Sequence, residues 1–175
     1  MSITVLRLGH RPHRDKRAST HLMLAARAFG ADNVFYSGIK DSRIEESIKK
    51  VCKEWGGEFS VTYIENWEKL IKEWEGKIIH LTMYGLELSK LINEIRADKN
   101  SKLVIVGGAK VPRNLYELTD WNVSITSQPH SEVSALAIFL HELFQGRELS
   151  SNFNNFRLKI TPSANGKVFE VFSKD

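Results

Sequence analysis

The sequence has a single cysteine and no long apolar run. Cys52 is alone among 175 residues, so it can form neither an internal disulfide nor a cysteine-rich metal site, and its helical apolar spacing predicts that it packs in the core. No run of about 18 apolar residues occurs, so no transmembrane helix is expected. The N-terminus also lacks the pattern of a signal peptide. We therefore expect a cytoplasmic protein with no membrane contact and no bound metal.

Phosphate-binding glycine motifs are also missing. The segment Gly107-Gly108 with Lys110 does not have the GxxxxGK[ST] spacing of a phosphate loop, and no GxGxxG motif is present. ATP, GTP and dinucleotides are therefore disfavoured as ligands, although the missing loops alone do not exclude them.

Short apolar runs alternate with amphipathic helical segments from residue 3 to residue 146. This order predicts an α/β fold, with a mostly parallel sheet and helices on both faces. The end of the chain differs, because Phe156–Ile160 and Val168–Phe172 are strand-like and flank the turn signal Asn165-Gly166. We expect one domain over residues 1–149 and a C-terminal β-hairpin over residues 150–175 that extends the same domain.

Positive charge is concentrated near the N-terminus, although the net charge is only +4. The pattern predicts a strand at Ile3–Leu8, a loop from Gly9 to Arg14, and a helix capped by Asp15. Apart from Asp15, the charged side chains of this segment are all basic: Arg7, Arg11, Arg14, Lys16 and Arg17, with His10 and His13 between them. Such a density at the end of a strand favours contact with a polyanion, and the alternative is a solvated basic loop.

Two turns follow buried strands and define a candidate pocket. Leu103–Val106 leads into Gly107–Pro112, and Trp121–Ile125 leads into the turn that ends at Glu132. In open α/β sheets ligands bind at such strand ends, so the two turns predict one shared pocket. Its backbone amides and carbonyls suit an adenine edge and a ribose. Glu132 can stabilise the next helix or contact the ligand, and the two roles are compatible.

Three stretches in this order resemble a known family. They are Arg7-Leu8-Gly9-His10-Arg11 through Arg17 with the helix that ends at Gly30, then Gly107–Pro112, then Gln128-Pro129-His130-Ser131-Glu132 before Ala135-Leu136-Ala137. The family is the archaeal tRNA cytidine-56 2′-O-methyltransferases of the SPOUT superfamily. The sequence departs from the pattern at Ala109, where an acidic residue is expected, and at Leu24, where ribose methylases of the wider superfamily have an arginine.

The resemblance implies an enzyme that methylates the ribose 2′-hydroxyl of cytidine 56 in the T-loop of tRNA, with S-adenosylmethionine as donor. It also implies a deep C-terminal trefoil knot and a homodimer packed through the first and last helices of the fold. The donor pocket that it implies consists of Leu81, Gly107, Gly108, Ala109, Lys110, Val111, Ile125, Thr126, Ser127, Gln128, Pro129, His130, Ser131 and Glu132.

Methyl transfer from a sulfonium requires mainly the alignment of donor and acceptor. Our hypothesis is that Arg17, helped by Arg14, anchors the adjacent phosphate and polarises the hydroxyl. Arginine is normally protonated, so a phosphate relay or His10 as base is an alternative. The expected RNA contacts are Arg7, Arg11, Arg14, Lys16 and Arg17. Two alternative functions remain at this point: a non-catalytic knotted RNA-binding module, and a 2′-O-methyltransferase that acts on ribosomal RNA.

Overall fold

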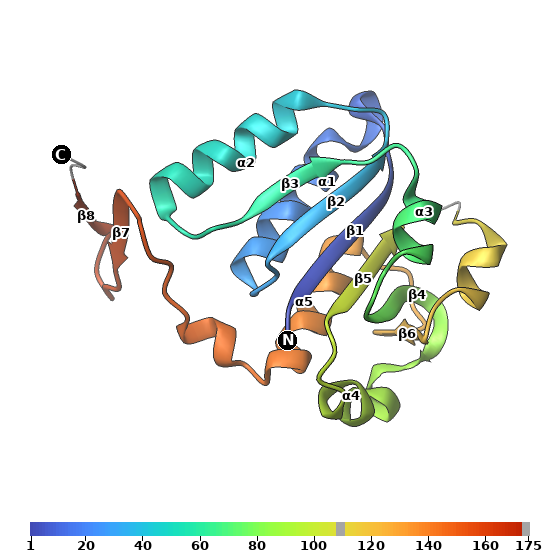
Figure 1. Cartoon of the computed structure of the whole chain (residues 1–175). Coiled ribbons are helices and arrows are strands. Elements are labelled where there is room, and N and C mark those ends of the chain that lie inside the picture. The colour runs from blue at the N-terminus through green and yellow to red at the C-terminus, as the bar shows by residue number, and fades with distance from the viewer. Residues whose placement is uncertain (108–110, 173–175) are drawn as a thin grey trace.

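A six-stranded parallel sheet forms the centre of the molecule (Figure 1). The structure is a computed structural model that describes residues 1–107 and 111–172, apart from the side chain of Lys16. The strand order is β3-β2-β1-β5-β4-β6, and every neighbouring pair is parallel. The strands are β1 (Ile3–His10), β2 (Asn33–Gly38), β3 (Ser60–Tyr63), β4 (Lys77–Glu87), β5 (Lys102–Gly107) and β6 (Trp121–Ser124). The predicted α/β fold is thereby confirmed.

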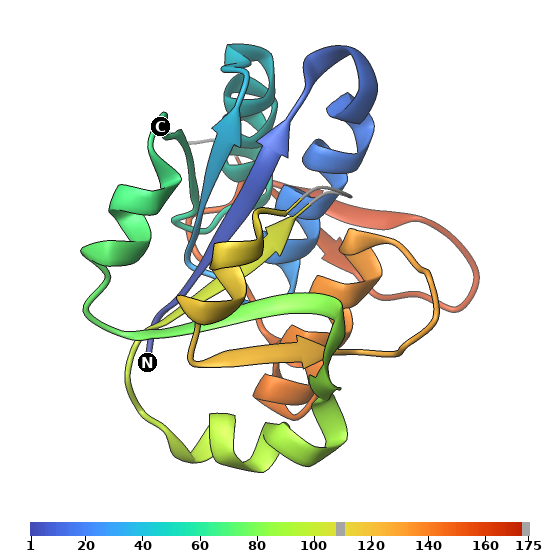
Figure 2. The same cartoon turned by 90° about the vertical axis from the view of Figure 1, so that its right-hand side faces the viewer.

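Helices cover both faces of the sheet (Figure 2). One face packs on α1 (Pro12–Ala28), α2 (Ser42–Trp55), α4 (Leu88–Ala97) and α5 (Glu132–Phe144), and the other on α3 (Trp67–Lys72) and the short helix η1 (Arg113–Glu117). Side chains of β1 alternate between the two cores, since Ile3 and Val5 belong to the first and Leu6 and Leu8 to the second. This alternation places Arg7 on the face that packs against α1 and α5.

The first helix begins earlier than the sequence predicts. The expected loop from Gly9 to Arg14 is wrong, because α1 already begins at Pro12. Proline suits the first helical position, where its fixed φ fits the helix and its missing N–H would have no partner. Asp15 is not the cap; it lies in the first turn, where its Oδ2 accepts a hydrogen bond from Arg11 Nε at 2.9 Å. Most of the basic segment is therefore helical rather than a flexible loop.

Three helices begin at residues whose side chains cap them. Asp41 caps α2 by accepting a hydrogen bond from the Arg43 amide, and Asn66 caps α3 in the same way through Lys69. Ser131 caps α5 through the Ser134 amide. The last of these caps fixes the place where the second predicted ligand turn becomes helix.

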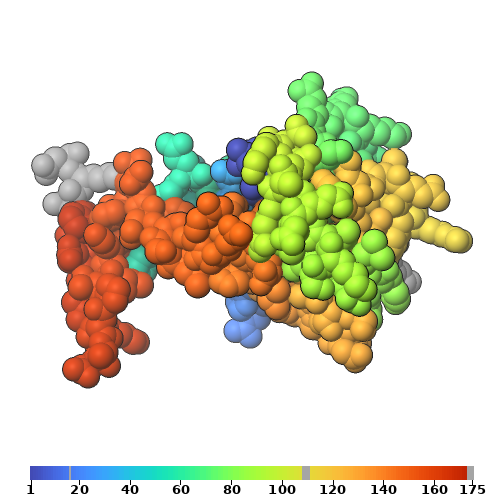
Figure 3. Space-filling view, turned by 90° about the horizontal axis from the view of Figure 1, so that it is seen from below, coloured from blue at the N-terminus to red at the C-terminus, as the bar shows by residue number. Residues whose placement is uncertain are grey.

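The C-terminal segment forms a separate two-stranded antiparallel sheet, as predicted. Strands β7 (Leu158–Thr161) and β8 (Val168–Val171) pair with each other and follow the short helix η2 (Arg147–Ser150). Figure 3 shows this hairpin standing apart from the body of the molecule. The division of the chain at residue 149 and the trefoil knot both stay predictions. Within the described residues, no helix has the length and apolar character needed to cross a membrane.

Candidate active site

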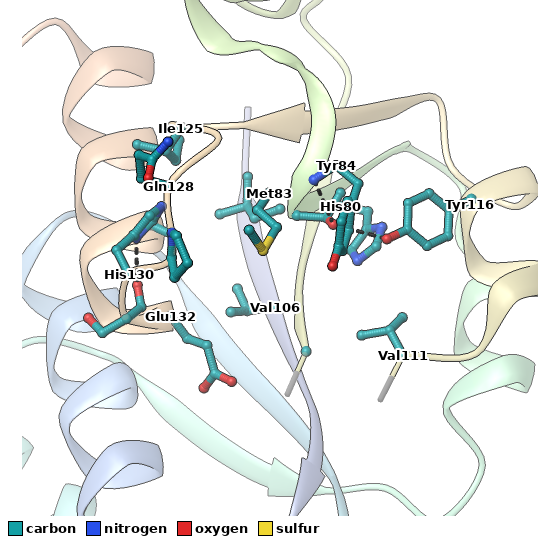
Figure 4. Close-up of a pocket in the computed structure, with 16 residues that line it drawn as sticks. His80, Met83, Tyr84, Val106, Val111, Tyr116, Ile125, Gln128, His130 and Glu132 are labelled. Carbon is teal, nitrogen blue, oxygen red and sulfur yellow. Dashed lines mark hydrogen bonds between the residues drawn. The ribbon is translucent and has the colours of Figure 1, made fainter. Parts of the chain in front are cut away.

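A cavity of about 480 Å³ lies where β4, β5 and β6 end (Figure 4). Both predicted ligand turns contribute to it. From the predicted donor pocket, nine residues line this cavity: Leu81, Gly107, Val111, Ile125, Gln128, Pro129, His130, Ser131 and Glu132. Two segments distant in the sequence therefore meet at one site, because β5 and β6 lie on either side of β4.

Five predicted pocket residues are not placed in this lining. Thr126 and Ser127 are exposed and do not line the cavity. Gly108, Ala109 and Lys110 lie outside the described residues. The β6–α5 turn therefore presents its second half, from Gln128 onward, to the cavity.

Seven residues that the sequence did not point to also line the cavity. They are His80, Thr82, Met83, Tyr84, Val106, Tyr116 and Ala135. Most come from β4, which continues to Glu87, directly before the start of α4 at Leu88. The apolar run at residues 78–83 signals a buried strand but not its place between β5 and β6. That position in the sheet is what brings the end of β4 to the site.

Hydrogen bonds between His80, Asn122 and Tyr116 stabilise the side of the cavity that β4 forms. The Asn122 amide nitrogen donates to the Tyr116 carbonyl at 2.9 Å, which leaves its Oδ1 as acceptor for His80 Nδ1 at 2.9 Å. His80 Nδ1 therefore carries the proton and Nε2 holds the lone pair. Burial lowers the pKa of His80, so its ring is neutral at pH 7. The Tyr116 hydroxyl also lies 3.0 Å from Thr82 Oγ1.

One ion pair connects the cavity to the N-terminal segment. Arg7 Nη2 lies 3.1 Å from Glu132 Oε2, with Arg7 only 2% exposed and Glu132 31% exposed. Burial raises the pKa of Glu132, and the Arg7 guanidinium opposes that rise. Arg7 is thus held inside by a carboxylate and by the Leu8 carbonyl at 2.8 Å. The expectation that Arg7 contacts RNA does not fit this buried position.

The cavity has the character of a nucleoside site with one negative charge. Its described lining combines apolar side chains with polar ones such as Gln128, His130 and Ser131, and Glu132 is its only carboxylate. Space for side chains is tight at the rim, since a Cβ on Gly107 would overlap the Val111 side chain. These features fit S-adenosylmethionine, because apolar and hydrogen-bonding side chains together suit its adenosyl part and a carboxylate suits its cationic sulfonium.

The remaining predicted arginines lie on the surface near the carboxyl ends of β1 and β2. Arg11, Arg14 and Arg17 are exposed, although Arg11 also pairs with Asp15. Arg11 and Arg14 line a second cavity of about 660 Å³, together with Tyr63 and Trp67. Arg17 lines neither cavity, and the side chain of Lys16 lies outside the described part of the chain. The exposed cations suit a polyanion such as RNA.

His10 is buried beneath this surface. Its Nδ1 lies 2.8 Å from Ser19 Oγ, and its Nε2 lies 3.8 Å from Asp41 Oδ2. Burial lowers the pKa of His10, against the opposing effect of Asp41. A neutral imidazole has a free lone pair, as a base requires, but this ring is 0% exposed and packed inside. Its position, bonded to Ser19 in the middle of α1, fits a residue that holds α1 against β1 better than one that meets the substrate.

The chain has the fold of the SpoU-type RNA methyltransferases. It aligns with the TrmH/SpoU tRNA modifying enzyme of A. aeolicus at a TM-score of 0.60 and 15% identity, over 85% of this chain and 76% of that one. It also aligns with the SpoU methyltransferase AviRb from Streptomyces viridochromogenes, solved in complex with AdoMet, at a TM-score of 0.58 and 13% identity, over 86% and 58% of the two chains. Identities this low show the fold alone.

Sequence comparison identifies the family. Residues 55–170 match the family model described as tRNA ribose 2′-O-methyltransferase, aTrm56. The chain is 51% identical to the tRNA (cytidine(56)-2′-O)-methyltransferase of Methanopyrus kandleri, over 95% of this chain and 94% of that protein. It is 50% identical to the enzyme of the same name from Methanocaldococcus jannaschii, over 96% of each. The chain belongs to the aTrm56 family of tRNA ribose 2′-O-methyltransferases.

Proposed function

We propose that this protein transfers a methyl group from S-adenosylmethionine to the ribose 2′-hydroxyl of cytidine 56 in tRNA, in the cytoplasm. The observation that carries the proposal is the donor-sized cavity between β4, β5 and β6, linked by the Arg7–Glu132 ion pair to a surface with exposed arginines. Family membership names the same reaction and the same nucleotide.

The donor is held by the turns at the strand ends. Gly107, Val111, Ile125 and the segment Gln128–Glu132 surround the adenosyl and methionyl parts through apolar contacts and backbone groups. S-adenosylmethionine supplies a methyl group on a sulfonium, which needs no further activation. The carboxylate of Glu132 favours a cation in the cavity, and Arg7 holds that carboxylate in place.

The acceptor is held by the arginines of α1. Arg17 and Arg14 anchor the phosphate next to the target ribose, which aligns its 2′-hydroxyl with the methyl group and polarises the hydroxyl. The proton passes to that phosphate or to solvent, because arginine stays protonated. His10 supports this arrangement from inside, by holding the middle of α1 through Ser19.

The protein acts as a homodimer packed through α1 and α5. Support comes from α5, whose residues Leu136, Phe139, Leu140 and Leu143 are buried while Ile138 remains 45% exposed on its outer side. The adjoining surface of α1 contributes small residues, including the exposed Ala18 and Ala28. Small side chains allow a second copy to approach closely.

Single-turnover assays with labelled S-adenosylmethionine and unmodified tRNA test the proposed roles. Arg17→Ala lowers the rate of methyl transfer at least about a hundredfold if this side chain aligns the acceptor. Lys50→Ala, which removes an exposed charge from α2, leaves the rate unchanged. Donor binding, measured by calorimetry with S-adenosylhomocysteine, stays normal in both. Full activity in Arg17→Ala contradicts the assignment, and absence of donor binding by the wild type favours the non-catalytic RNA-binding module.

A further inference from the structure

The C-terminal hairpin is attached to the body through a rigid stem. The Arg157 amide donates to the Glu54 carbonyl at 2.8 Å, and the Gly57 amide donates to the Asn154 carbonyl at 2.8 Å. Arg27 is buried, donates to the Gly56 carbonyl at 2.6 Å, and stacks on Phe153 at 4.1 Å from the ring centroid. A segment held by so many contacts has a defined direction, so the hairpin beyond it is presented in one orientation.

Beyond the stem the hairpin exposes an apolar face. Leu158 pairs with Val171 and Ile160 with Phe169, and directly paired residues point to the same face. Ile160 is 61% exposed, Phe169 59% and Val171 62%. Two-stranded hairpins are at best marginally stable alone in water. This face therefore needs a partner.

The rest of the described chain covers little of this face. Trp55 of α2 shares a cavity with Ile160 and Phe169 but leaves both side chains more than half exposed. Apart from its contact with α2, the hairpin extends past the body of the molecule (Figure 3). This face is therefore available to a second molecule.

The direction in which the hairpin extends indicates which molecule covers its apolar face. Figures 2 and 3 both show the hairpin extending beyond the body on the side where α1 and α5 lie. A second copy that docks on α1 and α5 occupies the space into which the hairpin extends. In a two-fold dimer the same contact is made twice, once by each copy.

We propose that the hairpin is an intersubunit arm whose face of Leu158, Ile160, Phe169 and Val171 packs on the α1/α5 side of a second copy. The inference rests on the dimer proposed above and extends that interface to the C-terminus. This role also explains the rigid stem, because an arm held in one orientation loses less entropy when it packs on its partner.

Sedimentation analysis of the full-length protein tests the arm. In Ile160→Thr/Phe169→Thr, β-branched threonines keep the hairpin propensity and remove the apolar contacts. The dimer dissociation constant is expected to rise at least about tenfold, since each copy loses two buried side chains. The matched control is Val168→Thr, which makes the same kind of change on the opposite face and is expected to leave the constant unchanged.

A direct contact test uses benzoylphenylalanine in place of Phe169, with a mixture of isotopically light and heavy chains. Cross-links between light and heavy chains in α1 or α5 are expected. Cross-links confined to one chain overturn the arm. An unchanged dimer dissociation constant in Ile160→Thr/Phe169→Thr also overturns the arm. The same conclusion holds if that variant keeps its dimer but binds tRNA more weakly. If the wild-type protein is a monomer, the dimer and the arm are both overturned. Methyl transfer by the wild-type protein is measured separately, so this outcome is distinguished from failure of the proposed reaction.

Discussion

Arg7 and Glu132 are the residues through which the two halves of the site act on each other. Arg7 lies on β1, which leads to the basic segment, and Glu132 begins α5 beside the donor cavity. A buried arginine is costly unless its charge is paired. The sequence singled out both residues but gave them separate roles, one with RNA and one at the helix start. Their contact depends on the packing of α5 against the sheet, which no local pattern encodes.

Breaking this pair is expected to destabilise the fold. Glu132→Gln leaves the buried Arg7 charge without its partner and lowers the free energy of unfolding by roughly 2 kcal/mol, below the usual range for fully buried pairs because Glu132 is partly exposed. Arg7→Met/Glu132→Gln recovers much of the loss. Urea unfolding of both single variants and the double variant measures the coupling. Strictly additive losses contradict the pairing.

His10 gives the stability a pH dependence. Burial lowers the pKa of His10 in the folded protein, so the unfolded chain binds the proton more readily as the pH falls below about 6.5. The contribution of the neutral ring is complete above that pH and is lost as the pH falls through the window toward the lowered folded pKa. Urea unfolding at pH 7.5 and pH 5.5 is expected to show a smaller loss in His10→Asn than in the wild type. Equal losses contradict a buried neutral His10.

For helices and strands, local sequence signals predicted the individual elements but not which elements pack together at the site. Asp41, Asn66 and Ser131 are caps that act within a few residues, so the starts of their helices could be predicted. The start of α1 was missed because Asp15 resembles a cap while Pro12 is the better signal. Apart from Leu81, the cavity wall from His80 to Tyr84 was missed for a different reason. Its role follows from the strand order β5-β4-β6, which is a property of the whole sheet.

Gly85, on β4, lies directly against the backbone of β6. A Cβ at this position would lie 2.5 Å from the backbone of Asn122, so Gly85→Ala forces the two strands apart beside the donor cavity. We expect a loss of about 1–3 kcal/mol in unfolding free energy and weaker binding of S-adenosylhomocysteine. Gly166→Ala is the control, because nothing lies within 4 Å of a Cβ there. Equal thermal unfolding temperatures for the two variants contradict the close packing.

The whole molecule combines a cavity that holds one carboxylate with a basic surface at one edge of the sheet. Arg14 and Arg17, near the start of α1, lie at the carboxyl ends of the strands, the edge at which the donor cavity also opens. The net charge of +4 is small, so attraction of tRNA depends on where the charge lies rather than on its total. This arrangement brings an anionic substrate toward the side of the molecule that holds the donor.

Binding of tRNA should therefore depend on salt through the α1 arginines. Each phosphate contact contributes about 0.9 to the slope of log affinity against log salt concentration on a duplex. Arg14→Ala is expected to lower that slope by nearly one and to weaken binding most at low salt. Lys50→Ala, on α2, serves as the matched change in charge. Identical slopes for Arg14→Ala and the wild type contradict the placement of RNA on this surface.

The central claim is transfer of a methyl group to one hydroxyl of one nucleotide. The most direct test is methyl transfer from labelled S-adenosylmethionine to two tRNA transcripts that differ only in carrying cytidine or 2′-deoxycytidine at position 56. One methyl group per molecule is expected on the first transcript, mapped to cytidine 56, and none on the second. Label at another nucleotide, equal label on the deoxycytidine transcript, or label on ribosomal RNA alone would contradict this claim.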